Sequence, residues 1–433
     1  MENISSAAAM KRPTSSKTSH KLKLKRVNTT EGVHPFDEIT WVKHDAVIGS
    51  GDNISFEQKG VEFPDFWSAN AVNITTSKYF RGKLDTPQRE TSLKQLITRI
   101  TSEIKKWGLK DGYFSDEVEA ELFEQELAYL MVNQHVAFNS PVQFNVGTKK
   151  KPQCSACFIL SVDDDMQSIL EWIKTEGTIF KGGSGAGVSI SNIRSSQETL
   201  STGGKSSGPV SFMRGADSVA GMIKSGGTTR RAAKMVVMGI QHPDAIEFIM
   251  CKANEEDKVR ALMEQGYDMT DLNNPAWDSI QYQNANNSIR LTDDFMKAVE
   301  NDGEWQTKFV TTGEVADTYR ARDLYRKIAE AAWKCGDPGL QLDDTINDWH
   351  TTPATGRINA SNPCSEYMSN DNSACNLASI NLMKYLKNDG NFKVEGFKHA
   401  VRTFITAQDI IVGNSSYPTP EIEKNTKSHR QLG

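Results

Sequence analysis

Short apolar runs alternate with amphipathic stretches from residue 139 onward, and this rhythm restricts the fold more than any other feature of the chain. The apolar runs predict five strands, at residues 156–162, 188–193, 235–240, 288–292 and 340–343. The amphipathic stretches between them predict helices near residues 166–180, 209–224, 243–252 and 321–334. Strand, helix and strand in this order predict an α/β domain built around a largely parallel sheet or barrel.

The chain before this point has a different pattern, and residues 36–137 are predicted to form a mainly helical region. Thr86 and Pro87 are typical of an N-cap and a first helical position, and apolar residues then recur at helical spacing until Gly108. A second helix is predicted to begin near Asp116, with Glu119 three residues later. Residues 1–35 are rich in Ser, Thr and Lys and predict a disordered tail, with a short nucleic-acid-binding or targeting arm as the alternative.

The composition argues against several classes of protein. A net charge of −5 gives no global basic field, so we expect no sequence-independent binding of nucleic acid. Because there is no run of eighteen apolar residues and no signal-peptide pattern, we expect a cytoplasmic protein without a membrane span. Six cysteines in 433 residues are too sparse for a secreted disulfide scaffold, so any disulfide is expected to be catalytic rather than structural.

The segment from Asn362 to Glu366 is the most informative motif. In an extended chain alternate side chains share a face, so Asn362, Cys364 and Glu366 would point into one pocket. Pro363 favours an extended residue before it and suits a loop or strand end that lines a cavity. Spacing alone favours a plainer alternative, a buried structural cysteine beside two surface polar residues.

Other motifs are weaker when taken singly. Cys154 and Cys157 form a CxxC, which fits half of a zinc site, a thioredoxin-like motif or inert cysteines, but no second CxxC or suitably spaced histidine favours zinc. The glycine-rich run at residues 181–187 fits either a plain turn or a loop that a ligand approaches closely. Residues 204–206 read Gly-Lys-Ser, yet a phosphate-binding P-loop also requires a glycine at position 199, which is Thr199.

Taken together, these motifs resemble the ribonucleotide reductases, and the proline form of the 362–366 loop looks like their adenosylcobalamin-dependent class. The resemblance implies that Cys364 becomes a thiyl radical, with Glu366 as general base on the ribose 3′-hydroxyl and Asn362 orienting the hydroxyls. It also implies that Cys157 and Cys375 form the reducing dithiol and end as a disulfide, which leaves Cys154 as an extra cysteine.

The same resemblance implies two sets of binding residues. The substrate-binding set consists of Ser140, Ala156, Cys157, Gly185, Asn362, Pro363, Cys364, Ser365 and Glu366. A deoxynucleoside triphosphate effector would bind to two glycine-containing loops, at residues 194–208 and 224–234, whose plainer alternative is mobile solvated loops. The effector-binding residues would be Asp164, Arg194, Lys224, Arg230 and Arg231. No metal-ligating residues are assigned.

The implied architecture is the first part of a ten-stranded α/β barrel over residues 138–433, preceded by the helical region. The implied cofactor is adenosylcobalamin. The implied partners are a ribonucleotide substrate, taken as the diphosphate, a deoxynucleoside triphosphate effector, a thioredoxin- or glutaredoxin-type reductant, the missing C-terminal half of the enzyme and a second copy of the chain. Alternatives are the large subunit of a metal-cofactor ribonucleotide reductase and, for this chain alone, a non-catalytic nucleotide-binding module.

Overall fold

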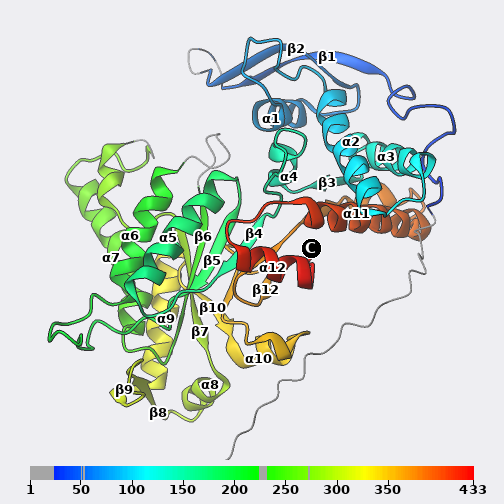
Figure 1. The fold of residues 1–433 in the computed structure, drawn as a ribbon. Coiled ribbons are helices and arrows are strands. Elements are labelled where there is room, and N and C mark those ends of the chain that lie inside the picture. The colour runs from blue at the N-terminus through cyan, green and yellow to red at the C-terminus, as the bar shows by residue number, and fades with distance from the viewer. Residues whose placement is uncertain (1–23, 50, 52–53, 224–231, 272–273) are drawn as a thin grey trace, which may run out of the picture.

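A six-stranded sheet organises the chain from Cys157 onward. The computed structural model describes residues 24–49, 51, 54–223, 232–271 and 274–433, and Figure 1 shows their arrangement. The sheet has the order β10-β7-β6-β5-β4-β13. Five strands run parallel, and β13 pairs antiparallel with β4. Their bounds are β4 Cys157–Leu160, β5 Gly185–Ser189, β6 Ala233–Gly239, β7 Ala285–Leu291, β10 Gly339–Leu342 and β13 Ser373–Cys375.

The two faces of the sheet are covered differently. Helices cover one face, where Phe158 and Leu160 join a large apolar cluster with residues of the helices (Figure 1). These helices are α5 Met166–Lys181, α6 Pro209–Met222, α7 Ala245–Glu264, α8 Asp293–Glu300 and α9 Ala321–Cys335. Ile159 points to the other face, because successive residues of a strand alternate, and packs there with Met235 and Ala360. That second face carries the short hairpin of β11 Ala360–Ser361 and β12 Met368–Ser369.

The sheet is open rather than closed into a barrel. Strands β10 and β13 form its two edges among the described residues. One face covered by helices and one face carrying an inserted hairpin is the arrangement of a partial α/β barrel. The predicted α/β class is confirmed, and each of the five predicted strands overlaps an observed one.

A second apolar core holds the N-terminal region together. It is built from α2 Leu93–Asp111 and α3 Glu117–Val132, and α11 Val394–Asn414 packs against both, although it lies far away in the sequence (Figure 1). An antiparallel pair of strands, β3 Val136–Phe138 and β14 Ala378–Ile380, lies between this core and the sheet. The remaining elements are α1 Ala69–Tyr79, α4 Ser140–Asn145, β8 Glu304–Lys308, β9 Val315–Arg320, α10 Asp343–Asp348 and α12 Pro420–His429.

The predicted ends of the first long helix are wrong. The N-cap is Ser92, not Thr86, because Ser92 and Gln95 form a capping box that satisfies two backbone N–H groups at the start of α2. Gly108 does not end the helix either. It lies inside α2 and leaves room for the Phe114 ring, because an added Cβ would be 2.3 Å from that ring. The helix ends at Gly112, which adopts a φ of 78°. The predicted start of the next helix is confirmed, since Asp116 caps α3.

Two further expectations for the N-terminal region need correction. The region that was expected to be mainly helical holds α1, α2 and α3 but opens with an antiparallel hairpin of β1 Trp41–Ile48 and β2 Phe56–Pro64. Disorder up to residue 35 is also wrong for residues 24–35. The buried Glu126 carboxylate accepts hydrogen bonds from the backbone N–H groups of Val27, Asn28 and Thr29, which fixes this segment on α3. Residues 1–23 lie outside the described residues.

Among the described residues, none of the helices combines the length and the apolar character needed to cross a bilayer.

Candidate active site

Two thiols face each other at one end of the sheet. Cys157 begins β4 and Cys375 ends β13, and the antiparallel register places them directly opposite each other. Directly opposite residues of such a pair have Cα atoms about 4.5–5.5 Å apart, and their side chains share a face. This spacing falls within the Cα separation of about 4.4–6.8 Å that a disulfide requires. The register therefore allows these two cysteines to alternate between dithiol and disulfide without a large backbone movement.

An amide and a carboxylate meet one of these thiols. The Nδ2 of Asn362 donates to the Sγ of Cys157 at 3.0 Å, and the Cys157 thiol donates to Oε1 of Glu366 over a longer 3.7 Å contact. The other end of the Asn362 amide is also fixed, because its Oδ1 accepts from the backbone N–H of Tyr367 at 3.0 Å. Asn362 is fully buried. The structure thus brings Cys157, Asn362 and Glu366 together from two separate segments.

The 362–366 segment is a tight turn, so the expected alternation of an extended chain is wrong here. The backbone N–H of Ser365 donates to the carbonyl of Asn362 at 3.1 Å, and Pro363 occupies the second position of this turn, where its fixed φ is favourable. Ser365 itself adopts a φ of 63°. As a result Asn362 is buried in the interior, whereas the side chains of Cys364 and Glu366 are exposed.

Glycines of β5 allow this turn to lie directly on the sheet. A Cβ on Gly187 would be 1.7 Å from the carbonyl oxygen of Ser361, and a Cβ on Gly185 would be 2.7 Å from the ring of Pro363. Asn286 of β7 also donates to the carbonyl of Pro363 at 2.8 Å. The sequence predicted a close approach of a ligand to this glycine run. In the structure the chain's own turn makes that approach.

Burial controls the protonation of the paired thiols. Burial raises the pKa of Cys157 to about 12, although the hydrogen bond from Asn362 partly opposes this effect. Burial likewise raises the pKa of Cys375 to about 12, and the charges of Cys157 and Glu366 act in the same direction. Both groups are therefore neutral thiols at physiological pH. Neutral thiols can donate hydrogen or protons, and they are poor nucleophiles.

The other predicted substrate-binding residues differ in whether they contact this cluster of thiols. Ala156 donates its backbone N–H to the carbonyl of Cys375 at 3.1 Å, so it adjoins the thiol pair. The hydroxyl of Ser365 lies 3.2 Å from that of Ser361. Ser140 begins α4, and its hydroxyl lies 3.0 Å from the Tyr79 hydroxyl rather than in contact with the cysteines. Cys154 packs in the apolar core of the N-terminal region, and its thiol donates to the carbonyl of Pro152.

Two of the predicted effector residues form an ion pair with each other. Both the backbone N–H and the Nε of Arg194 donate to the Asp164 carboxylate, at 2.9 and 2.6 Å. Lys224, Arg230 and Arg231 lie outside the described residues. Among the residues that the structure does describe, no cluster of three or more His, Cys, Asp or Glu side chains is arranged to hold a metal ion.

Sequence reasoning missed Gly187 and Asn286, which position the turn. Gly187 carried a signal, because it belongs to the glycine-rich run that was singled out. No sequence signal marked Asn286, because a polar residue just before a predicted strand is typical of a strand end.

Two family models match the chain. The model described as "Ribonucleotide reductase, barrel domain" matches residues 155–433. The model described as "Class II vitamin B12-dependent ribonucleotide reductase" matches residues 48–134.

Curated relatives agree with these matches. A "Vitamin B12-dependent ribonucleotide reductase" of Streptomyces coelicolor is 57% identical over 100% of this chain and 45% of its own length. A protein of the same name from Rhodopirellula baltica is 48% identical over 93% of this chain and 42% of its own length. A "Vitamin B12-dependent ribonucleoside-diphosphate reductase" of Thermoplasma acidophilum is 31% identical over 81% of this chain and 43% of its own length. The chain spans less than half the length of these relatives.

Because the barrel-domain match covers more than half of the chain and the relatives agree with it, the chain belongs to the ribonucleotide reductase family, in its vitamin B12-dependent class.

Proposed function

We propose that this chain provides part of the catalytic core of an enzyme that reduces ribonucleotides to 2′-deoxyribonucleotides. The observation that carries the proposal is the convergence of Cys157, Asn362 and Glu366, with Cys375 directly opposite Cys157 and Cys364 exposed on the same turn. This set combines a thiol that a radical can reach, a carboxylate, an amide and a pair of neutral thiols. Ribonucleotide reduction needs each of these groups.

The residues divide the chemical work as follows. Cys364, as a thiyl radical, removes the 3′-hydrogen atom of the ribose, and the resulting carbon radical weakens the neighbouring bond to the 2′-oxygen. Glu366 accepts the proton of the 3′-hydroxyl while Asn362 holds the hydroxyls by hydrogen bonds. The 2′-hydroxyl leaves as water. Cys157 and Cys375 supply two protons and two electrons and become a disulfide. Glu366 returns its proton to the 3′-oxygen, and Cys364 finally returns the hydrogen atom to the 3′ carbon.

The position of Cys364 fits an external radical source. Cys364 is exposed on the turn, whereas Cys157 and Cys375 are buried beneath it, so a bulky group can approach only the first of these three thiols. When bound, adenosylcobalamin supplies the carbon-centred radical that takes the hydrogen atom of a thiol. The protein's own contribution is to present one thiol to that group and to shield the other two.

The substrate, the effector, the reductant and a second copy of the chain are the proposed partners. We infer that the substrate is a ribonucleoside diphosphate, bound by the turn residues 362–366, which cover Gly185, together with Ser140 and Ala156. A deoxynucleoside triphosphate would bind as effector by opening the ion pair between Asp164 and Arg194. A thioredoxin- or glutaredoxin-type protein would reduce the disulfide.

Met166 and Leu170 are exposed on α5 and offer an apolar surface for a second copy of the chain.

The open edge of the sheet supports a requirement for further polypeptide. Leu340 and Leu342 of β10 and the nearby Trp349 are exposed and line a groove of about 810 Å³. An unpaired strand edge beside exposed apolar side chains is a surface that proteins normally cover. We infer that additional chain, present in the longer relatives, covers this edge and completes the catalytic unit as the missing C-terminal half.

The direct test is Cys364→Ser in the complete enzyme, assayed with adenosylcobalamin. We expect turnover to be lost while deoxynucleoside triphosphate binding is retained, because a hydroxyl O–H bond is far stronger than a thiol S–H bond. Cys335→Ser is the matched control and should keep turnover, since Cys335 ends α9 and its thiol donates to the carbonyls of Ala331 and Asp337. Normal turnover of Cys364→Ser would refute the radical role. Loss of effector binding as well would indicate a general folding defect, which circular dichroism would detect.

A further inference from the structure

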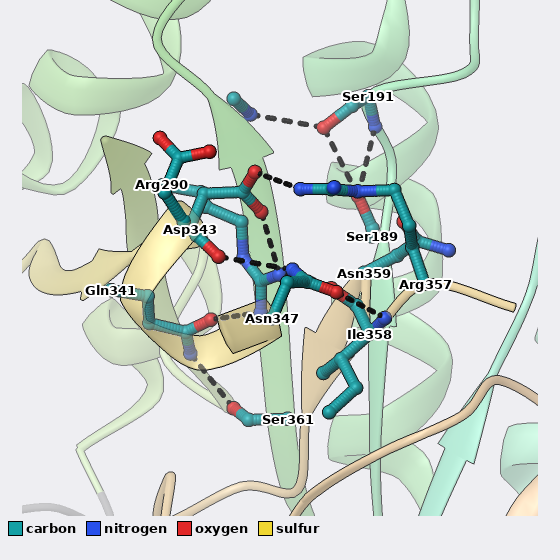
Figure 2. Close-up of polar contacts among 12 residues, drawn as sticks. Ser189, Ser191, Arg290, Gln341, Asp343, Asn347, Arg357, Ile358, Asn359 and Ser361 are labelled. Carbon is teal, nitrogen blue, oxygen red and sulfur yellow. Dashed lines mark hydrogen bonds and ion pairs between the residues drawn. The ribbon is translucent and has the colours of Figure 1, made fainter. Parts of the chain in front are cut away.

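A second polar site lies at the opposite end of the sheet from the cysteines. A cavity of about 170 Å³ opens where the parallel strands end, and Figure 2 shows the polar contacts of the residues around it. Its lining comprises Ser189, Ser191, Asn192, Gly239, Gln241, Arg290, Thr292, Asp343, Arg357 and Asn359. All of these except Gly239 carry a polar side chain. Ser189 is four residues beyond Gly185 on β5, which places the cavity roughly 13 Å along the strand from the thiol pair.

Two arginines share one carboxylate at this cavity. Arg290 is buried and donates to Oδ1 of Asp343 at 3.0 Å, and Arg357 donates to Oδ2 of the same carboxylate at 2.6 Å (Figure 2). Gln341 accepts from the other terminal nitrogen of Arg290 at 3.0 Å, and the carbonyl of Ile358 accepts as well. Arg290, Arg357 and Asp343 together carry a net charge of +1. Within this trio the two guanidinium groups outnumber the one carboxylate, and Asp371, whose field also reaches Arg290, is the further acidic group near them.

One of the two arginines keeps donors for a ligand. The side chain of Arg357 is 58% exposed, and its contact with Asp343 uses only one terminal nitrogen. A guanidinium has five N–H donors in a planar fork that matches the oxygens of phosphate. Arg290 cannot play this part, because its terminal nitrogens are already engaged. Arg290 is then the fixed charge of the site, and Arg357 is the group that touches the ligand.

Serine hydroxyls add donors on the other side of the cavity. The hydroxyls of Ser189 and Ser191 lie 3.0 Å apart, and that of Ser191 accepts the backbone N–H of Gly239 at 2.9 Å (Figure 2). Because one hydroxyl proton lies between the two oxygens, the other remains available to a ligand. The carboxyl ends of parallel strands are also the usual position of ligand sites in open α/β sheets.

The surrounding acidic groups limit which anion fits. Asp371 is the other carboxylate whose field reaches Arg290, and burial raises its pKa to about 6, so it carries only part of its charge in mildly acidic solution. A groove of about 540 Å³ adjoins the cavity at Gln241 and Thr292 and is lined by Asp294, Glu304 and Asp344. Lys308 also lines this groove, so its three carboxylates and one lysine leave a net negative charge that disfavours a chain of phosphates. The cavity volume corresponds to roughly five to six waters, enough for one phosphate group.

We propose that this cavity binds a single phosphate group, either as inorganic phosphate or as the end of a phosphate monoester. Arg357 and the serine pair donate to its oxygens, and the buried Arg290 balances its charge. The site is separate from the thiol cluster and does not depend on the radical chemistry. Inorganic phosphate and a nucleoside monophosphate are the two sources that present this group.

Isothermal titration of the 433-residue chain with inorganic phosphate, and separately with a nucleoside monophosphate and triphosphate, tests the proposal. We expect binding of at least one of the first two ligands, and Arg357→Ala should weaken it by about tenfold or more. Arg320→Ala is the matched control, because Arg320 is 60% exposed and also pairs with a single aspartate, Asp302. It should leave binding unchanged. Arg357→Lys should bind with intermediate affinity, since it keeps the charge and loses the fork.

Three results would overturn the proposal: no binding of either monophosphate ligand, equal binding by Arg357→Ala and the unmodified chain, or tighter binding of the triphosphate at the Arg357-dependent site. Tighter binding of inorganic phosphate than of the monoester would identify the free ion as the ligand. Cys364→Ser should bind phosphate normally, so failure of the radical assignment and failure of this proposal can be told apart.

Discussion

The two ends of β5 belong to one strand but lie in opposite environments. At its start, Gly185 and Gly187 are covered by the chain's own turn, and the adjacent thiols are buried and neutral. At its end, Ser189 faces an open cavity with two arginines and a shared aspartate. The comparison shows that one sheet can bury reactive groups at one end of its strands and present fixed charges at the other end. Glycines leave room for the covering turn at the first end, and serine and arginine side chains supply hydrogen-bond donors at the second.

The substitution expected to disturb the buried end of β5 most is Gly187→Ala, which adds a single methyl group. In Gly187→Ala the new Cβ would meet the carbonyl oxygen of Ser361 at 1.7 Å, and this backbone atom can move only with the whole turn. We expect the free energy of unfolding to fall by about 3 kcal/mol or more, measured from urea denaturation. The contact of Asn362 with Cys157 should be lost as well.

Gly215→Ala is the control for this substitution. Gly215 lies within α6 and has open space where its Cβ would be, so the change should be neutral or slightly stabilising, because alanine favours helix. A Gly187→Ala chain as stable as the unmodified one would contradict the close packing of the turn on β5.

A smaller effect concerns the reactivity of the cysteines at the same end. A thiol with a pKa of about 12, as burial gives Cys157 and Cys375, is only about one ten-thousandth thiolate at pH 8. The exposed Cys364 should therefore react with iodoacetamide at pH 8 at least about 100-fold faster than either of them, as measured by mass mapping over time. The difference should vanish in denatured protein. Equal rates in the folded chain would mean that the thiol pair is not shielded.

The five parallel strands could be predicted from the sequence, because each contains apolar residues, several of which are buried in β4, β5, β6 and β7. Val236, Val237 and Met238 of β6 are fully buried and lie within the predicted strand at residues 235–240. Strands β11, β12 and β13 have two or three residues each, too few to show a period. Helix α11 was not predicted, although Ala400, Phe404 and Ile411 recur at helical spacing.

The residues of the candidate site could be predicted, but their arrangement in space could not. The resemblance named Cys157, Asn362, Glu366 and Cys375, whereas the tight turn at Pro363 replaced the expected extended segment. The direct opposition of the two thiols depends on the register of β13, which pairs residues more than two hundred positions apart. The arginine cavity was missed for a related reason. Arg290 lies in an apolar run, and its partners come from distant segments.

The measurement that tests the central claim most directly is disulfide mapping of the folded chain after mild oxidation with a thiol-specific oxidant. The account predicts a crosslink between Cys157 and Cys375, because the β4–β13 register places them directly opposite each other. Cys154 should remain reduced within the apolar core of the N-terminal region. A crosslink between Cys154 and Cys375, with Cys157 still reduced, would contradict both the pairing and the role assigned to the thiols.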